Sequence, residues 1–110
     1  MKGYKFLRKK EDKLVSPACL NHERKVYDEE TIVGMRDFLT FFRNKEAAKK
    51  FRKKILECLE GHYALYEIEA PNSDIISFDE INYRFRGEPF EGVAFTHKII
   101  LKRKIEEFSF

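Results

Sequence analysis

The segment NKEAAKKFRKKILECLEG, from Asn44 to Gly61, carries the clearest structural pattern in this chain. Its apolar residues recur every three or four positions, which predicts one apolar face of an amphipathic helix. These residues are Ala47, Ala48, Phe51, Ile55, Cys58 and Leu59. Asn44 can cap the first turn by accepting a hydrogen bond from an unpaired amide, and Gly61 can adopt the left-handed conformation that ends many helices. We therefore predict a helix from about Lys45 to Leu59.

Strand patterns precede this helix. Residues 4–8 and 14–16 predict the two strands of a hairpin joined by a charged turn, and residues 25–27 predict a third short strand. The acidic residues 28–31 predict a solvated turn.

Strand patterns also follow the helix. Residues 63–70 predict a half-buried strand, because Ala64, Tyr66, Ile68 and Ala70 share one face while Glu67 and Glu69 lie on the other. These two glutamates could form a carboxylate pair, but we expect them to be solvated or to pair with lysines of a neighbouring strand. Residues 93–105 alternate over their whole length and predict one long, central strand with His97 on its apolar face.

The order of these elements predicts the fold class. An antiparallel sheet with the helix packed across one face is the economical way to bury the apolar stripe of the helix. At 110 residues the chain is close to the usual size of one domain. We therefore predict a single α+β domain over residues 1–110, with an antiparallel β-sheet and one basic amphipathic α-helix packed on one face.

Charge is concentrated on the predicted helix. The whole chain carries 22 Lys+Arg against 19 Asp+Glu, a formal net charge of +3, which is low for a protein that is basic over its whole surface. Between residues 43 and 54, however, only one acid, Glu46, accompanies the basic residues. These are Arg43, Lys45, Lys49, Lys50, Arg52, Lys53 and Lys54. We predict that they bind an acidic partner, the alternative being a solvated helix face.

A second predicted binding segment lies between residues 71 and 92. It combines turn residues with an aromatic and arginine cluster of the kind that protein interfaces favour. From this cluster, which also holds Phe85 and Phe90, we select Tyr83, Arg84 and Arg86 as binding residues. The alternative is a hairpin that closes over the sheet edge.

The sequence contains one candidate metal set. The spacings Cys19-x-x-His22 and Cys58-x-x-x-His62 would let each pair hold a shared zinc ion. Cys58, however, falls on the apolar face of the helix, where a buried thiol is common. We therefore predict no metal and no cofactor, with a small zinc-binding domain as an alternative.

No catalytic motif is visible. The chain has three histidines but no Gly-x-Ser-x-Gly and no glycine-rich phosphate loop. The order of an aromatic strand with Thr40, a helix and a strand with glutamates is loosely similar to small ADP-ribosyltransferase domains, whose arginine, serine and glutamate pattern is absent. We predict that the protein is not an enzyme, and keep an ADP-ribosyltransferase-like domain as an alternative.

Composition also bears on location. No stretch approaches the roughly 20 apolar residues that a membrane span needs, and the first ten residues lack the apolar core of a secretory signal. Two cysteines are too few for a disulfide framework. We therefore expect a cytoplasmic protein.

A family resemblance rests on short motifs spread over nearly the whole chain. They are Gly3-Tyr4-Lys5-Phe6, Lys13-Leu14-Val15-Ser16, Lys25-Val26-Tyr27, Phe42-Arg43-Asn44 with Glu46-Ala47-Ala48 and Phe51, Tyr66-Glu67-Ile68-Glu69, and Gly92-Val93 with residues 98–105. With these motifs the chain resembles a family of small, uncharacterised accessory proteins of bacteriophages and prophages. Relatives commonly carry a Gly-Phe-His tract before the helix, whereas Phe38–Phe42 contains neither Gly nor His. No site is therefore predicted at that tract.

The resemblance implies a phage accessory protein with no assigned catalytic residue. Together with the basic helix, it implies a non-enzymatic binding module that engages a host or viral protein or nucleoprotein complex in the bacterial cytoplasm. An inhibitor of a CRISPR-type antiphage effector is one concrete form of this expectation. The alternative is a protein that binds the phosphates of RNA or DNA without sequence preference.

Overall fold

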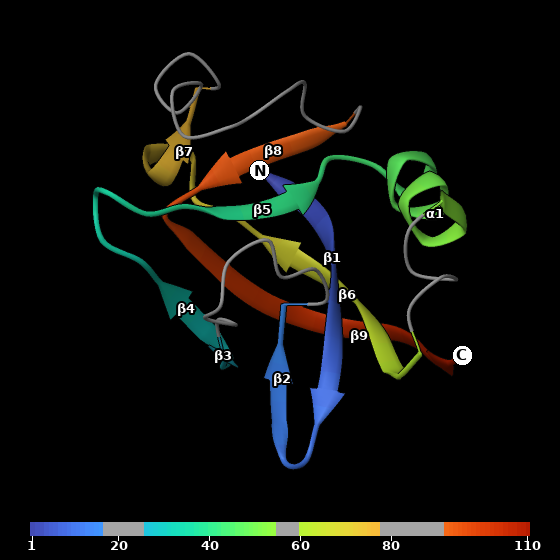
Figure 1. The fold of residues 1–110 in the computed structure, drawn as a ribbon. Helices are drawn as coiled ribbons and strands as arrows, with labels where there is room; N and C mark the ends of the chain where they lie inside the picture. Colours follow the sequence, from blue (N-terminus) through green and yellow to red (C-terminus); the bar gives the residue numbers. More distant parts are fainter. Residues whose placement is uncertain (17–25, 55–59, 78–91) are drawn as a thin grey trace.

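The computed structural model describes residues 1–16, 26–54, 60–77 and 92–110 (Figure 1). Its elements are β1 (Lys2–Lys10), β2 (Lys13–Val15), β3 (Val26–Tyr27), β4 (Glu30–Ile32), β5 (Leu39–Phe42), α1 (Lys45–Lys54), β6 (His62–Glu69), a 3-10 turn (Asn72–Asp74), β7 (Ile75–Ile76), β8 (Val93–Thr96) and β9 (Lys98–Ser109). All the strands belong to one antiparallel sheet, and α1 packs against it. The predicted α+β fold class is confirmed.

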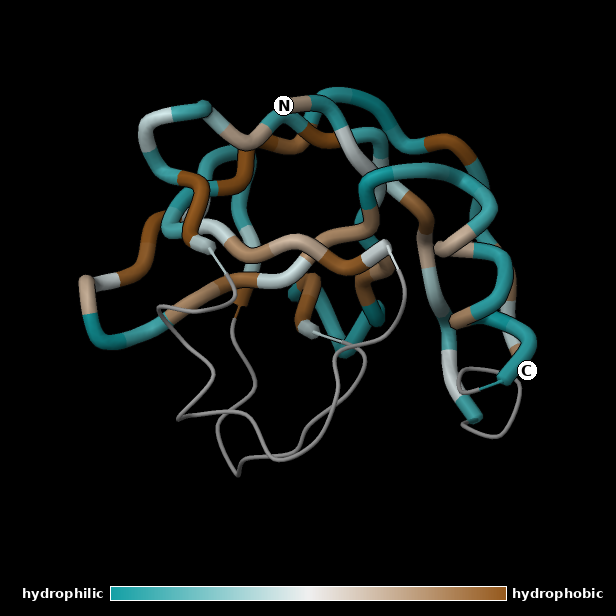
Figure 2. The backbone as a smooth tube through the Cα atoms, turned by 90° about the horizontal axis from the view of Figure 1, so that it is seen from above, coloured by the Kyte–Doolittle hydropathy of each residue, from teal (hydrophilic) through white to brown (hydrophobic). Residues whose placement is uncertain are grey.

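The sheet curls on itself. Its main strand order is β4-β9-β6-β1-β5-β8-β7, and β2 and β3 extend it beside β1. β8 and β9 are separated in sequence only by His97, yet they occupy distant places in this order. The paired strands therefore follow a closed path from β9 through β6, β1 and β5 to β8, and seen from above they run around a common centre (Figure 2).

A corner at His97 divides the long strand that the sequence predicts over residues 93–105. His97 N–H donates to Asp74 O at 2.9 Å, and His97 O accepts from Val33 N–H at 2.9 Å. The hydroxyl of the fully buried Thr96 bonds Asp74 O at 3.1 Å and accepts from Lys98 N–H at 3.3 Å. Because these bonds satisfy the backbone at the bend, the chain can change direction there. The prediction of one uninterrupted strand, with His97 on its apolar face, is wrong.

Irregular pairing between β6 and β9 breaks the alternation further. Leu65 pairs with Glu106 but Tyr66 pairs with Lys104, so that Ile105 is an extra residue on β9. A second shift between Glu67 and Ile68 leaves Lys102 extra in the same way. Such bulges change the face to which the following side chains point.

Two hydrophobic clusters cover opposite faces of β1 and β6. The cluster inside the curl consists of Leu7, Tyr27, Leu39, Phe41, Ile68, Ala70 and Ile99. The cluster under the helix consists of Phe6, Phe42, Ala47, Ala48, Tyr63 and Leu65. The strand predicted at residues 63–70 is confirmed as β6. The prediction that only one of its faces is buried is wrong in its first part, because Tyr63 and Leu65 are buried on the face opposite to Ile68.

The remaining strand predictions have mixed outcomes. The hairpin is confirmed by the antiparallel pairing of β1 with β2, and the third strand by Val26–Tyr27, its residue Lys25 lying outside the described residues. The predicted acidic turn at residues 28–31 is wrong from Glu30 onward, because Glu30–Ile32 pairs with β9. No helix in the described ranges is both long enough and apolar enough to cross a membrane.

Candidate functional site

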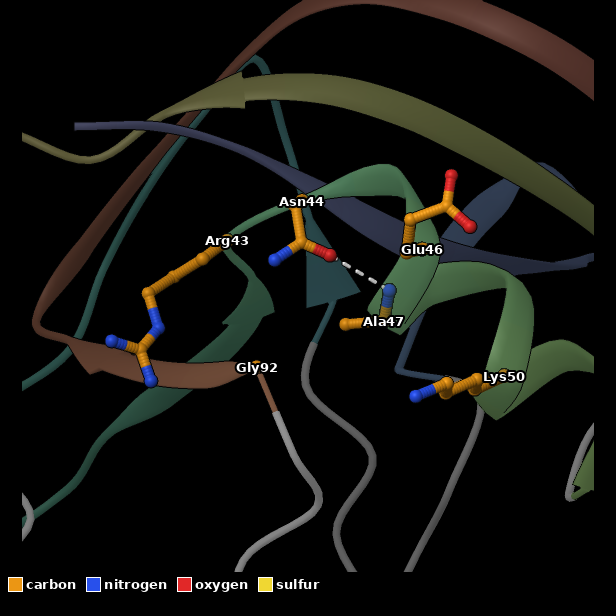
Figure 3. A pocket seen from close by; sticks show the side chains of 6 residues that line it. All are labelled: Arg43, Asn44, Glu46, Ala47, Lys50 and Gly92. Carbon is orange, nitrogen blue, oxygen red and sulfur yellow. Dashed lines mark hydrogen bonds between the residues drawn. The ribbon is translucent and has the colours of Figure 1, made fainter.

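The start of α1 is fixed by a side-chain cap. Ala47 N–H donates to Asn44 Oδ1 at 2.8 Å, which satisfies one of the otherwise unpaired amides of the first turn (Figure 3). The predicted cap is therefore confirmed. Residues 55–59 of the predicted helix lie outside the described residues. Gly61, expected to end the helix, exchanges two backbone hydrogen bonds with Phe110.

The apolar stripe of α1 faces the sheet. Ala47 and Ala48 are buried, and the ring of Phe51 lies 5.1 Å from that of Phe42 and 6.1 Å from that of Phe6, centroid to centroid. This inward orientation of Phe51 confirms the prediction. The opposite side of α1 is left to polar side chains.

Most of the predicted basic binding residues, on α1 and directly before it, are exposed. We call the exposed ones the basic face, which comprises Arg43, Lys45, Lys49, Lys50, Lys53 and Lys54. Lys45 Nζ lies 5.8 Å from the centre of the Tyr4 ring. Lys49 and Lys53 make no ion pair or hydrogen bond with any described residue, and they are about 6 Å apart along the helix axis. Glu46 is also exposed there.

Arg52 does not belong to the basic face. Its guanidinium lies 3.9 Å from the centre of the Phe108 ring and forms an ion pair with Glu106. The stacking and the ion pair tie α1 to β9. The positive charge of Arg52 is therefore balanced within the molecule, and we leave it out of the proposed contact.

A shallow hollow of about 460 Å³ lies at the start of α1 (Figure 3). It is lined by Arg43, Asn44, Glu46, Ala47, Lys50 and Gly92. Gly92 is required at its position, because its φ is +81° and a Cβ there would lie 2.4 Å from Ala47 Cβ. The lining mixes two cations with one carboxylate, so the hollow adds no ligand preference beyond that of the basic face.

The other predicted site residues are spread over different parts of the chain. Tyr83, Arg84 and Arg86 lie outside the described residues, and so do Cys19, His22 and Cys58 of the candidate zinc set. Its fourth member, His62, is exposed at the start of β6. In the parts of the chain that the structure describes, no group of three or more His, Cys, Asp or Glu side chains could hold a metal ion.

The ion pairs of the sheet lie on its surface. Glu67 accepts a hydrogen bond from Arg103 at 3.0 Å across the β6–β9 pairing, so the expected contact with a neighbouring strand is present, but its partner is an arginine and not a lysine. On β9, the Lys104 ammonium bonds Glu107 at 2.8 Å. This bond and the charge of Lys104 lower the pKa of Glu107, and the same contact raises the pKa of Lys104.

Two features were missed by sequence reasoning. Lys5 is buried, and its Nζ donates to Thr40 Oγ1 at 3.1 Å and lies 5.4 Å from the centre of the Tyr27 ring. The apolar side chain of Ile32 is 64% exposed on β4. The alternation around Lys5 places it on the same face as Leu7, which is a signal in the sequence for its burial. The acidic residues before Ile32 predicted a turn, so no signal in the sequence indicated a strand there.

Comparison of the chain with protein-family models, with curated proteins and with solved structures finds no match. The fold and the surface therefore define a class only: a curled antiparallel sheet whose single described α-helix presents a basic face. The resemblance to phage accessory proteins stays a prediction.

Proposed function

We propose that this protein is a non-enzymatic binding module that attaches to an acidic surface of a partner protein through the basic face of α1. The proposal is carried by one observation: while α1 packs Ala47, Ala48 and Phe51 against the sheet, six basic side chains on α1 and directly before it stay exposed. The cap and the packing of Phe51 hold the helix against the sheet, so the basic side chains project from fixed backbone positions. Such a surface accelerates and orients the approach of an acidic partner.

Three features favour an acidic protein over a nucleic acid. Non-specific binding of single strands uses aromatic side chains on which bases stack, and the aromatic residue of the described helix, Phe51, points inward. A guanidinium is the group best suited to bidentate phosphate contacts, and of the two in this basic run that of Arg52 is engaged by Glu106, which leaves Arg43 as the one arginine of the basic face. Glu46 places a negative charge among the lysines.

The resemblance to phage proteins suggests which partner to test. A bacterial antiphage effector of the CRISPR type has to hold nucleic acid, and a small protein bound at its surface could block that step. We propose that this chain acts by such occlusion in the cytoplasm of the bacterial host. The charge of the basic face and the family resemblance support this form of the proposal.

The test measures binding of fluorescently labelled poly-L-glutamate and of a labelled DNA duplex as a function of salt concentration. In one variant the charges of Lys49, Lys50 and Lys53 are reversed to glutamate. We expect saturable binding of polyglutamate at low salt, loss of at least tenfold in affinity on charge reversal, and weaker binding of the duplex. The same variant is then tested against purified antiphage effectors.

A second variant supplies the control. Reversal of Lys9, Lys10 and Lys13, which are exposed around the β1–β2 hairpin, changes the net charge by the same amount. Equal losses in both variants would show that net charge alone is responsible and would contradict the proposal. Duplex DNA that binds more tightly than polyglutamate, with the loss confined to the α1 variant, would assign the basic face to nucleic acid instead.

A further inference from the structure

The outer edge of β4 is unpaired within the described part of the chain. β4 is the end strand of the sheet order and pairs there only with β9. Glu29 O accepts a hydrogen bond from β9 at 2.8 Å, and Val33 N–H donates one to His97 O at 2.9 Å. Bonded and non-bonded residues alternate along an antiparallel pair. The backbone N–H and C=O groups of Glu30 and Ile32 therefore point away from β9.

Exposed apolar side chains accompany this edge. Ile32 is 64% exposed, and Met35, in the turn that follows, is 88% exposed. The cross-strand pairing places Glu30 and Ile32 on one face of the sheet. An edge that combines free backbone groups with an exposed apolar side chain is a template for a further strand.

The charge of this edge is negative. The segment from Val26 to Asp37 carries four acids, all exposed, and one base, Arg36. The acids are Asp28, Glu29, Glu30 and Asp37. Lys98 pairs with Glu30 at 2.6 Å, so the negative charge beside the edge rests on Asp28 and Glu29.

This charge decides between possible occupants of the edge. Two copies of the same edge would bring like charges together, which disfavours a symmetric pair of β4 strands. The basic elements of a second copy do not fit this edge. α1 is a helix and cannot add to a strand, and it lies on the opposite side of the molecule from β4 (Figure 1). The lysine-bearing strands β1 and β2 already have strand partners on both sides. Charge complementarity therefore favours a basic, extended segment of another protein.

We propose that the outer edge of β4 binds an extended, lysine- or arginine-containing segment of a partner protein by adding it to the sheet as a further strand. The segment pairs its backbone with Glu30 and Ile32, packs an apolar side chain against Ile32 and places basic side chains beside Asp28 and Glu29. This surface is distinct from the basic face. Strand addition at β4 can therefore be wrong without affecting the proposed binding through the basic face, and the reverse also holds.

The test is an NMR titration of the ¹⁵N-labelled full chain at low salt. The titrant is a seven-residue peptide with blocked termini in which lysine alternates with valine. We expect saturable shifts of the amide signals of Glu30 and Ile32. Ile32→Pro removes an outward N–H, while the odd-numbered residues that bond β9 keep their N–H groups. We expect this variant to bind the peptide about tenfold more weakly. Ile32→Thr keeps the N–H and removes the apolar contact, so its loss should be smaller.

Peptide controls keep the proposal falsifiable even if Ile32→Pro does not fold. In two further peptides the backbone nitrogens of alternate residues are methylated, the odd-numbered residues in one peptide and the even-numbered residues in the other. At least one of these two peptides should fail to bind the unaltered protein. Equal binding of both methylated peptides would overturn strand addition, and equal binding of a peptide with glutamate in place of lysine would overturn the choice of a basic partner. Self-association that Ile32→Pro abolishes would assign the edge to a second copy and would also overturn the proposal.

Discussion

Arg52 illustrates how the role of one residue depends on its position around the helix. By sequence it belongs to the same basic run as Lys49 and Lys53, but the structure places its guanidinium on the Phe108 ring and beside Glu106. An arginine suits this position because its planar group can stack and pair at once, which a lysine cannot do equally well. The exposed positive charge of this run is thus carried by the lysines and by Arg43.

Another residue-scale contact predicts a dependence on pH. The hydrogen bond from Lys104 lowers the pKa of Glu107, so this pair stabilises the fold above the pKa that Glu107 has in the unfolded chain. The contribution is lost as the pH falls through the lower, folded-state pKa. We expect Lys104→Met to raise the pKa of Glu107 toward its ordinary value, as measured by NMR titration of the side-chain carboxyl carbon. An unchanged titration would show that the contact is not maintained in solution.

At the scale of the element, α1 depends on how its first turn is completed. The Asn44 side chain bonds Ala47 N–H, and Gly92 leaves room for Ala47 at the same end of the helix. The described part of the helix spans ten residues, and helices of about that length owe most of their stability to packing and to capped ends. Both contacts therefore hold the basic face in place.

Removal of the cap should weaken the fold. We expect Asn44→Ala to lower the free energy of unfolding by about 1 kcal/mol, because it leaves a first-turn amide without its partner. Urea denaturation followed by circular dichroism measures the change. Asn44→Asp keeps an acceptor oxygen and should be close to neutral; a loss as large as that of the alanine variant would contradict the role of the cap.

The sequence predicts the elements better than their mutual arrangement. The cap at Asn44 and the inward stripe of α1 follow from local rules, and they were found as expected. The corner at His97 and the bulges of β9 depend on which strands meet across the curl, and periodicity alone does not encode that. The edge of β4 was missed for the same reason, since only its pairing with β9 makes a strand of Glu30–Ile32.

At the scale of the whole molecule, the corner between β8 and β9 joins the two ends of the path that runs from β9 through β6, β1 and β5 to β8. Thr96 is fully buried there, and its hydroxyl bonds the backbone of Asp74 and of Lys98. The corner thereby connects the turn before β7 with the strand that borders β4 and β6. A single hydroxyl thus contributes to closing the path of strands.

Loss of this hydroxyl should destabilise the entire fold. Thr96→Val keeps the shape of the side chain but leaves Lys98 N–H without the acceptor it has in Thr96, whereas Asp74 O keeps its bond from His97 N–H. We expect the free energy of unfolding to fall by about 1–3 kcal/mol. The urea midpoint should shift while the slope of the transition stays unchanged. Thr31→Val, whose hydroxyl makes only exposed contacts with Asp28, is the matched control and should change the stability by less than about 0.5 kcal/mol. Equal effects would contradict a special role for the corner.

The closed path of strands also bears on how the chain reaches its native state. β1 pairs with β6, so that Lys2 meets Glu69, and the path closes only when β9 joins β6. Contacts between residues so far apart in sequence impose a large entropic cost before they yield any stabilisation, and sheets rich in them fold in milliseconds to seconds rather than microseconds. Assembly is therefore expected to be a late and cooperative event. During synthesis, the edges of the earlier strands would therefore stay unpaired until β9 emerges from the ribosome and pairs with β6.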